Sequence, residues 1–214
     1  MLAKKKEDEI VKIINSMAGK YQADKIFKDW VQMYALSIAN SCPVVGTNIW
    51  CKREEEFKTI RSKYKEEEFV KFTEMCVLLN DALSLEIYDI LGNIYMREGY
   101  GERRTKQYYT PFEISELSAN IVLENKEKDV IRVHEPTCGS GSMVIAIAKK
   151  LGQGYQGKLE VIAQDLDWNN IYMSYVQFSL LNIRANVIQG DVIEEPFNRN
   201  FNIERVFKTP AMYL

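Results

Sequence analysis

The sequence is poor in the residues that bind transition metals. It contains one histidine, His134, and four cysteines that form no Cys-x-x-Cys pair. Structural zinc sites use several such ligands at short spacing, so we predict no metal site. Separated cysteines of this kind are typical of reduced thiols in a cytoplasmic protein. The four are Cys42, Cys51, Cys76 and Cys138.

The sequence also lacks an apolar run of the roughly 20 residues that cross a bilayer, so no membrane contact is predicted. It opens at Met1 with a lysine-rich stretch rather than an apolar leader, which favours a cytoplasmic location. The formal net charge is −2, so the overall charge does not indicate nucleic-acid binding. Any contact with DNA has to come from a local basic patch.

Residues 1–95 are predicted to form a helical N-terminal region. Apolar residues recur there at helical spacing, and charged residues fill the remaining positions. The aromatic residues on these faces are expected in the core. Helices are expected at about residues 10–17, 24–40, from 49 onward, and 69–83.

The pattern changes in residues 96–214, which we predict to be a second domain. Glycine, tyrosine and arginine are frequent in residues 92–110, which indicates an exposed connection. Apolar β-branched runs then alternate with helical patterns, which is typical of a parallel sheet in an α/β fold. Strands are expected at 130–135, 159–164 and 186–189, and helices at 111–123, 141–151 and 168–182.

A glycine-containing loop joins the first predicted strand to the helix after it. The loop runs from Glu135 to Met143 and has glycine at 139 and 141. Glycine has no Cβ, so a ligand can approach the backbone closely. The free N–H groups at the start of the helix favour a carboxylate or phosphate. The segment therefore predicts a small-molecule site at the carboxyl end of a strand.

Two acidic residues follow the next two strands. Asp165 ends the second strand, where a carboxylate can accept hydrogen bonds from the ribose of an adenosine ligand. The alternative is a surface acid that caps the next helix, although Asp167 is better placed for capping. Asp191 ends the third strand and can accept from an adenine amino group. Its alternative is an ordinary turn aspartate.

The sequence resembles the adenine-N6 DNA methyltransferases, above all the modification subunits of type I restriction systems and the phage-type N-6 DNA methylases. The resemblance rests on Gln107-Tyr108-Tyr109-Thr110-Pro111 followed by a helix and the loop from Glu135 to Met143, and it covers residues 105–191. It implies a Rossmann-like fold that binds S-adenosylmethionine. Tyr109, Thr110 and Pro111 would cover the cofactor, and Asp165 and Asp191 would hold its ribose and adenine. Its methionine end would be held by Glu135, which faces the ammonium, and by Pro136, Thr137, Cys138, Gly139 and Gly141.

The family's catalytic Asn-Pro-Pro or Asp-Pro-Pro sequence is absent from the 214 residues. In that family the motif holds the target amine, and the base is extruded from the duplex to reach it. Thr209 and Pro210 stand at the corresponding place and are the candidates for this role. The family sheet has about seven strands, whereas only three or four are expected here, so the second domain is predicted to be truncated. The uncovered sheet is expected to pack on the N-terminal helices, a second copy or another subunit.

A basic and aromatic cluster in residues 95–108 is the candidate DNA contact. Such residues together suit phosphate contact and base stacking. The alternative is a solvated connection in which Glu98 and Glu102 offset the charge. The cluster comprises Arg97, Arg103, Arg104 and Lys106, with Tyr95, Tyr100 and Tyr108 between them.

Three functions remain open at this point. The first is an S-adenosylmethionine-dependent adenine-N6 DNA methyltransferase, in which the protein mainly orients the reactants. Sequence specificity would then require a partner subunit. The second is a degenerate relative that binds the cofactor in a regulatory or assembly role, which the missing motif favours. The third, a methyltransferase for RNA or a small molecule, is disfavoured by the 107–111 motif.

Overall fold

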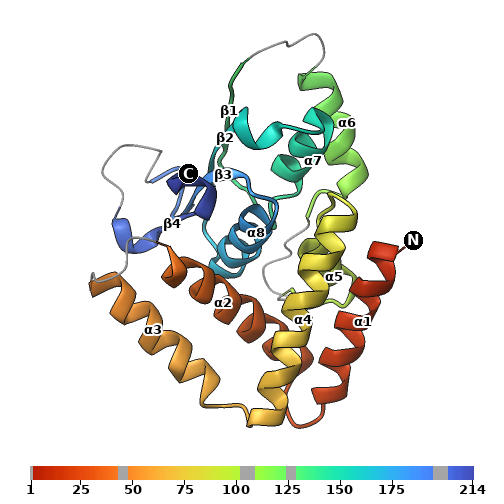
Figure 1. The fold of residues 1–214 in the computed structure, drawn as a ribbon, viewed down its shortest axis with the longest axis vertical. Helices are drawn as coiled ribbons and strands as arrows, with labels where there is room; N and C mark the ends of the chain where they lie inside the picture. Colours follow the sequence, from red (N-terminus) through yellow and green to blue (C-terminus); the bar gives the residue numbers. More distant parts are fainter. Residues whose placement is uncertain (1, 43–47, 102–108, 124–128, 195–201) are drawn as a thin grey trace.

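The computed structural model describes residues 2–42, 48–101, 109–123, 129–194 and 202–214. Within these ranges a group of helices precedes a small sheet with interleaved helices (Figure 1). The α-helices are α1 (Leu2–Met17), α2 (Ala23–Ser41), α3 (Asn48–Arg61), α4 (Glu66–Leu85), α5 (Ile90–Arg97), α6 (Phe112–Val122), α7 (Ser142–Leu151) and α8 (Trp168–Leu180). The strands are β1 (Ile131–Glu135), β2 (Leu159–Asp165), β3 (Arg184–Gln189) and β4 (Val206–Lys208). Short 3-10 turns occupy Tyr155–Gly157, Ile203–Arg205 and Pro210–Tyr213.

The N-terminal helices pack through the apolar faces that their spacing predicts. Helix α1 lies along α4, and α2 lies between α3 and α8 (Figure 1). Ile10 and Ile14 of α1 and Trp30 of α2 are almost completely buried. These residues belong to one hydrophobic core that continues into the sheet. The helical region is thereby attached to the α/β part through α2 and α8.

Helix α5 corrects the prediction of an exposed connection at residues 92–110. Its residues Leu91, Ile94 and Tyr95 are buried. The helix has only eight residues, and its glycine and arginine make the apolar spacing difficult to recognise in the sequence. Burial against distant helices, rather than local composition, decides its structure. The predicted domain division between residues 95 and 96 falls within this helix.

Three members of the predicted DNA-contacting cluster are also used inside the protein. The rings of Tyr95 and Tyr100 pack on Phe27 of α2, with ring centroids 5.9 and 5.2 Å apart. The Arg97 guanidinium forms an ion pair of 2.6 Å with the buried carboxylate of Glu7. Tyr95 and Tyr100 are therefore core residues, because their rings are buried where the helices pack together. Arg103, Arg104, Lys106 and Tyr108 lie outside the described residues.

The sheet has the order β1-β2-β3-β4. Strands β1, β2 and β3 are parallel, as the alternation of strands and helices predicts. Helix α7 packs against β1, and α8 packs against β2 and β3, while α6 lies on α7. The Asp167 carboxylate accepts a hydrogen bond of 2.8 Å from the Asn169 amide, so the predicted cap of α8 is confirmed. Because these three strands are parallel, their carboxyl ends lie at the same end of the sheet.

Strand β4 departs from the parallel pattern. It pairs antiparallel with β3, so that Val206 lies opposite Ile188 and Lys208 opposite Asn186. Within the described ranges, β1 stands at the other edge of a four-stranded sheet. The fold is thus an incomplete Rossmann-like α/β fold. Among the helices that the structure describes, none has the length and apolar character to cross a membrane.

Candidate functional site

The loop between β1 and α7 requires both of its glycines. Gly139 and Gly141 have φ angles of +54° and +98°, which side chains with a Cβ rarely adopt. A Cβ at Gly139 would approach the Tyr109 ring to 2.9 Å. A Cβ at Gly141 would come within 2.5 Å of the Phe178 ring. The loop backbone is therefore closely packed on both sides, against Tyr109 on one side and against α8 on the other.

Backbone hydrogen bonds fix the loop against β2. The Cys138 amide donates to the Gln164 carbonyl at 2.9 Å, and the Gly141 amide donates to the Cys138 carbonyl at 2.8 Å. The Gly139 amide donates to Asp165 Oδ2 at 2.9 Å. These three amides already have acceptors in the protein and are not available to a ligand carboxylate. Amides in the first turn of an α-helix have no acceptor within the helix, and such groups favour anions.

The Asp165 carboxylate joins the loop to the start of α8. Besides Gly139, it accepts from the Asp167 amide at 2.9 Å and from Asn170 Nδ2 at 3.0 Å, both at Oδ1. An ionised carboxylate offers about four lone-pair positions, and these bonds use three of them. Asp165 thus combines a structural role with a remaining acceptor position. It does not act as the cap of α8, which is Asp167.

Around this loop lies a cavity of about 460 Å³. Its walls come from the loop, from Tyr109 and Thr110, from the start of α8 and from α6. The residues predicted from sequence that line it are Tyr109, Thr110, Glu135, Thr137, Cys138, Gly139 and Asp165. Sequence reasoning missed Ser115, Ser140, Ser142, Met143 and Asn170. Ser140 and Ser142 lie within the predicted loop segment, so their positions in the sequence indicated that they could line the site. Ser115 belongs to α6 and Asn170 to α8, and only the packing of these helices places them at the cavity.

Tyr109 closes one side of the cavity. Its hydroxyl donates to Asn170 Oδ1, and its ring meets Tyr95 edge to face with centroids 5.5 Å apart. Burial raises the pKa of the Tyr109 phenol well above its usual range, so the phenol stays protonated and remains a donor. Tyr109 and Thr110 also line a smaller neighbouring cavity of about 230 Å³ that includes Pro111. The described tyrosine of the predicted pair therefore stands between two cavities.

Cys138 is a buried thiol rather than a nucleophile. Its Sγ lies 3.8 Å from the Ser174 hydroxyl oxygen. Burial raises the pKa of this thiol above its usual range, so the thiolate that would react is scarce at neutral pH. Within the described residues, no group of three or more histidine, cysteine or acidic side chains is arranged to hold a metal ion.

The structure does not bring Asp191 into the lining of this cavity. Its Oδ1 accepts from the Ile193 amide at 2.8 Å and more weakly from the Glu194 amide at 3.4 Å. These bonds shape the turn after β3, in agreement with the turn-aspartate alternative. Pro136 and Gly141 shape the loop but are not among the residues that line the cavity.

Thr209 and Pro210 follow β4, at the end of the sheet opposite the carboxyl ends of the parallel strands. Thr209 is completely buried, and its hydroxyl donates to the Ile183 carbonyl at 2.7 Å and accepts from the Ala185 amide at 3.0 Å. Both partners stand at the amino end of β3. Because β4 is antiparallel, the chain carries this pair away from the carboxyl ends of β1 and β2. The expected position of the pair beside the cofactor site is therefore wrong in this structure.

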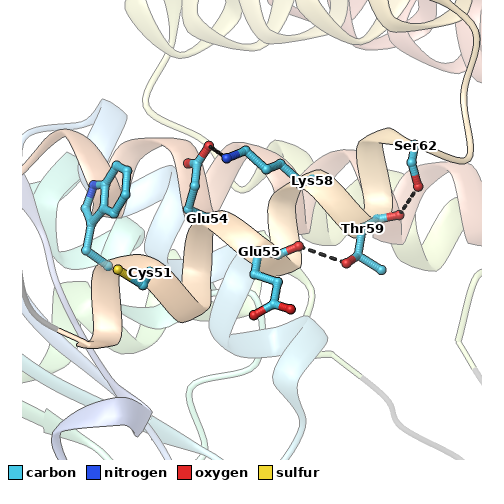
Figure 2. A pocket seen from close by; sticks show the side chains of 7 residues that line it. Cys51, Glu54, Glu55, Lys58, Thr59 and Ser62 are labelled. Carbon is cyan, nitrogen blue, oxygen red and sulfur yellow. Dashed lines mark hydrogen bonds and ion pairs between the residues drawn. The ribbon is translucent and has the colours of Figure 1, made fainter.

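A second hollow lies on helix α3, as Figure 2 shows. It encloses about 530 Å³ and is lined by Trp50, Cys51, Glu54, Glu55, Lys58, Thr59 and Ser62. Lys58 pairs with Glu54 at 3.3 Å, and Thr59 donates to the Glu55 carbonyl at 2.8 Å. These bonds stay within one helix. Lys58, Glu54 and the Thr59 hydroxyl therefore bond within α3 and do not point together toward a common ligand position. The glycine loop remains the better candidate site.

Comparison with known proteins agrees with this geometry. The model of the family described as N-6 DNA Methylase matches residues 86–210, which is more than half of the chain. The chain belongs to this family. The matched segment begins before α5 and ends at Pro210, so it includes the glycine loop, Tyr109 and Asp165.

Two relatives are methylase subunits of type I restriction enzymes. The MpnII subunit of Mycoplasma pneumoniae is 26% identical over 111 residues, which cover 50% of this chain and 20% of the relative. The MjaVIII subunit of Methanocaldococcus jannaschii is 32% identical over 124 residues, which cover 55% of this chain and 21% of the relative. The chain therefore spans about a fifth of the length of these relatives.

A solved structure shares the fold. It is the methyltransferase subunit of a type I restriction-modification system from Streptococcus thermophilus, with a TM-score of 0.50 and 12% sequence identity. The likeness covers 93% of this chain and 60% of that one. At this level of identity it concerns the arrangement of helices and strands, including the helical N-terminal part.

Proposed function

We propose that this chain provides the S-adenosylmethionine site of an adenine-N6 DNA methyltransferase of the restriction-modification type. The observation that carries the proposal is the cavity at the carboxyl ends of β1 and β2. There the glycine loop, Asp165 and Tyr109 surround about 460 Å³. Cavities of this size are usual for cofactors and other small ligands.

The residues present fit the chemical groups of this cofactor. Two carboxylates, Glu135 and Asp165, line a cavity that also adjoins the N-terminus of α7. A ligand with an ammonium, a carboxylate and ribose hydroxyls matches acidic groups beside a helix N-terminus. Gly139 leaves its side of the cavity free of a Cβ, where any side chain would meet Tyr109. This pattern supports binding of an amino-acid-linked nucleoside.

We assign these groups as follows. Glu135 binds the ammonium, and the first-turn amides of α7 bind the carboxylate. Asp165 accepts from the ribose through its remaining acceptor position. Tyr109 and Thr110 cover the bound molecule. When bound, S-adenosylmethionine supplies an activated methyl group, and the task of these residues is to hold and orient it.

The DNA substrate and the partner subunit are part of the same proposal. Both relatives are methylase subunits of type I restriction enzymes, which supports a chain that acts together with other subunits. Among the described residues of the basic and aromatic cluster, Tyr95, Tyr100 and Arg97 are engaged within the protein. DNA contact is therefore assigned to the assembled protein rather than to these three side chains.

Isothermal calorimetry with S-adenosylmethionine tests the cofactor site. We expect binding by the wild type and a Kd at least about tenfold higher for Asp165→Ala, which removes a charged hydrogen-bond acceptor. Asp81→Ala is the matched control, since Asp81 is a half-exposed residue of α4 that pairs with Lys6 and does not line the cavity. An unchanged Kd for Asp165→Ala, or no binding by the wild type, would contradict the assignment.

A second candidate is a subunit that binds the cofactor without transferring its methyl group. The burial of Thr209, and its position with Pro210 away from the carboxyl ends of the parallel strands, favour it. A radiolabelled transfer assay with unmethylated duplex DNA separates the two. Label in adenine with the wild type, lost with Asp165→Ala, supports the methyltransferase, whereas cofactor binding without label supports the second candidate.

A further inference from the structure

A buried carboxylate lies directly beneath the glycine loop. Asp89 is 5% exposed and is the N-cap of α5. Its Oδ1 accepts from the Gly92 amide at 3.0 Å, as a capping aspartate does. Its Oδ2 accepts from the Ser140 hydroxyl at 2.6 Å. One carboxylate thus bonds a helix of the N-terminal part and the loop between β1 and α7.

Gln177 of α8 completes the network. Its Nε2 donates to Asp89 Oδ1 at 2.9 Å and to the Ser140 carbonyl at 3.0 Å. Its Oε1 accepts from the Leu91 amide at 3.1 Å. Asp89, Ser140 and Gln177 are all buried, and each is bonded to the other two. A buried polar network that is fully satisfied specifies one arrangement of the elements it joins.

Close packing makes this contact demanding. A Cβ at Gly92 would lie 2.2 Å from Ser140 Oγ and 2.4 Å from Asp89 Oδ2. Helix α5 therefore approaches the loop as closely as a backbone without a side chain allows. Burial raises the pKa of the Asp89 carboxyl, and the bonds from Ser140, Gln177 and Gly92 oppose that rise.

We propose that Asp89 is a positioning residue for the cofactor loop and that it makes the N-terminal helices part of the S-adenosylmethionine site. The inference rests on the proposed function. Ser140 stands between Gly139 and Gly141, which have no Cβ and therefore allow the loop many conformations when it is not anchored. The network holds both the side chain and the carbonyl of Ser140, and it thereby fixes the residues that line the cavity.

Amide hydrogen exchange without ligand tests the positioning itself. Ser140→Ala removes the bond from the Ser140 hydroxyl to Asp89. It leaves the bond from Gln177 to the Ser140 carbonyl and the bond from the Gly92 amide to Asp89. We expect exchange at residues 137–142 to rise about tenfold in Ser140→Ala and in Asp89→Ala, the effect of losing one charge-assisted bond. Exchange within β2 and β3 should not change. Asp89→Asn, which keeps the shape and an acceptor for Gly92, should restore most of the protection.

Calorimetry with S-adenosylmethionine tests the consequence. Ser140→Ala and Asp89→Ala should each raise the Kd about tenfold while the stoichiometry stays that of the wild type. The double variant should bind no more weakly than Asp89→Ala, since both changes break the same bond. Ser118→Ala is the matched control, because Ser118 lies on the outer face of α6 and bonds only its own helix in the described structure.

A capping role alone gives a different pattern. Asp89→Ala would then increase exchange in α5 and lower the thermal stability, with loop exchange and Kd equal to those of Ser118→Ala. Ser140→Ala would have no effect. That result overturns the proposal, even if Asp89→Ala itself does not fold, because Ser140→Ala decides it. A wild type that does not bind the cofactor refutes the proposed function, while loop exchange still decides whether Asp89 holds the loop.

Discussion

Replacing Gly141 with alanine tests how tightly the loop is packed against α8. Gly141 is the N-cap of α7, with φ 98° and ψ 10°. An alanine there must adopt a left-handed backbone conformation, which costs about 1–2 kcal/mol. Its Cβ would also stand 2.5 and 2.7 Å from Cε1 and Cζ of Phe178. Overpacking of a buried ring adds about 1–3 kcal/mol, so we expect a total loss of about 2–5 kcal/mol.

Gly154 is a matched control in the same chain. Its φ of 90° and ψ of 9° are nearly those of Gly141, but a Cβ there would meet nothing within 4 Å. Gly154→Ala should therefore cost only the conformational part, about 1–2 kcal/mol. The difference between the two variants isolates the contact with Phe178.

Urea denaturation followed by circular dichroism measures both free energies of unfolding. Phe178→Leu sharpens the test, because leucine has no atoms in the positions of Cε1 and Cζ. In that background the cost of Gly141→Ala should fall toward the cost of Gly154→Ala. Equal costs for the two glycine variants in the wild-type background would refute the reasoning, since the crowding against α8 would then contribute nothing.

Three further predictions concern the rest of the chain. In the native protein the exposed Cys51 should react with a thiol reagent faster than Cys76, because burial raises the pKa of the Cys76 thiol to about 11; equal rates measured by mass spectrometry would contradict this. The hydrogen bond from Lys20 and the Lys65 amide lower the pKa of Glu68 to about 2, so Glu68→Gln should reduce the Tm at neutral pH. The stabilising effect of Glu68 is complete above pH 4.5 and is lost as pH falls toward 2, so the two melting curves should converge there. Glutamate at Leu117 or Ile121, which are 55% and 66% exposed on α6, should change the stability by less than about 0.5 kcal/mol, whereas a large loss together with a smaller particle in light scattering would show that a second copy covers this face.

Local signals were sufficient to predict the three parallel strands and part of the cavity lining. β-branched runs and helical spacing located β1, β2 and β3 within about two residues, because each pattern lies within one element. The two glycines and the capping position of Asp167 were predicted for the same reason. Tyr109, proposed from the sequence as a cofactor-covering residue, lies in the cavity wall.

The misplaced features depend on contacts between distant residues. Tyr95 and Tyr100 resemble surface residues in a stretch rich in glycine and arginine, but their rings pack on Phe27 of α2, which is distant in the sequence. The position of Thr209 depends on the direction in which β4 pairs with β3, which no local pattern encodes. Asp89 carries no signal of its role, since its partners Ser140 and Gln177 follow 51 and 88 residues later.

The sequence by itself determined that this chain has a strand, a glycine loop and a helix followed by an acid at the next strand end. These features depend on backbone freedom and on the alternation of apolar residues, which are properties of short segments. Only the tertiary structure decided which groups surround the loop. The Asp165 carboxylate became partly a structural acceptor, Thr209 was carried to the far end of the sheet, and Asp89 came to lie beneath the loop. Each of these outcomes follows from burial, because a buried polar group must find its partners wherever the packed chain supplies them.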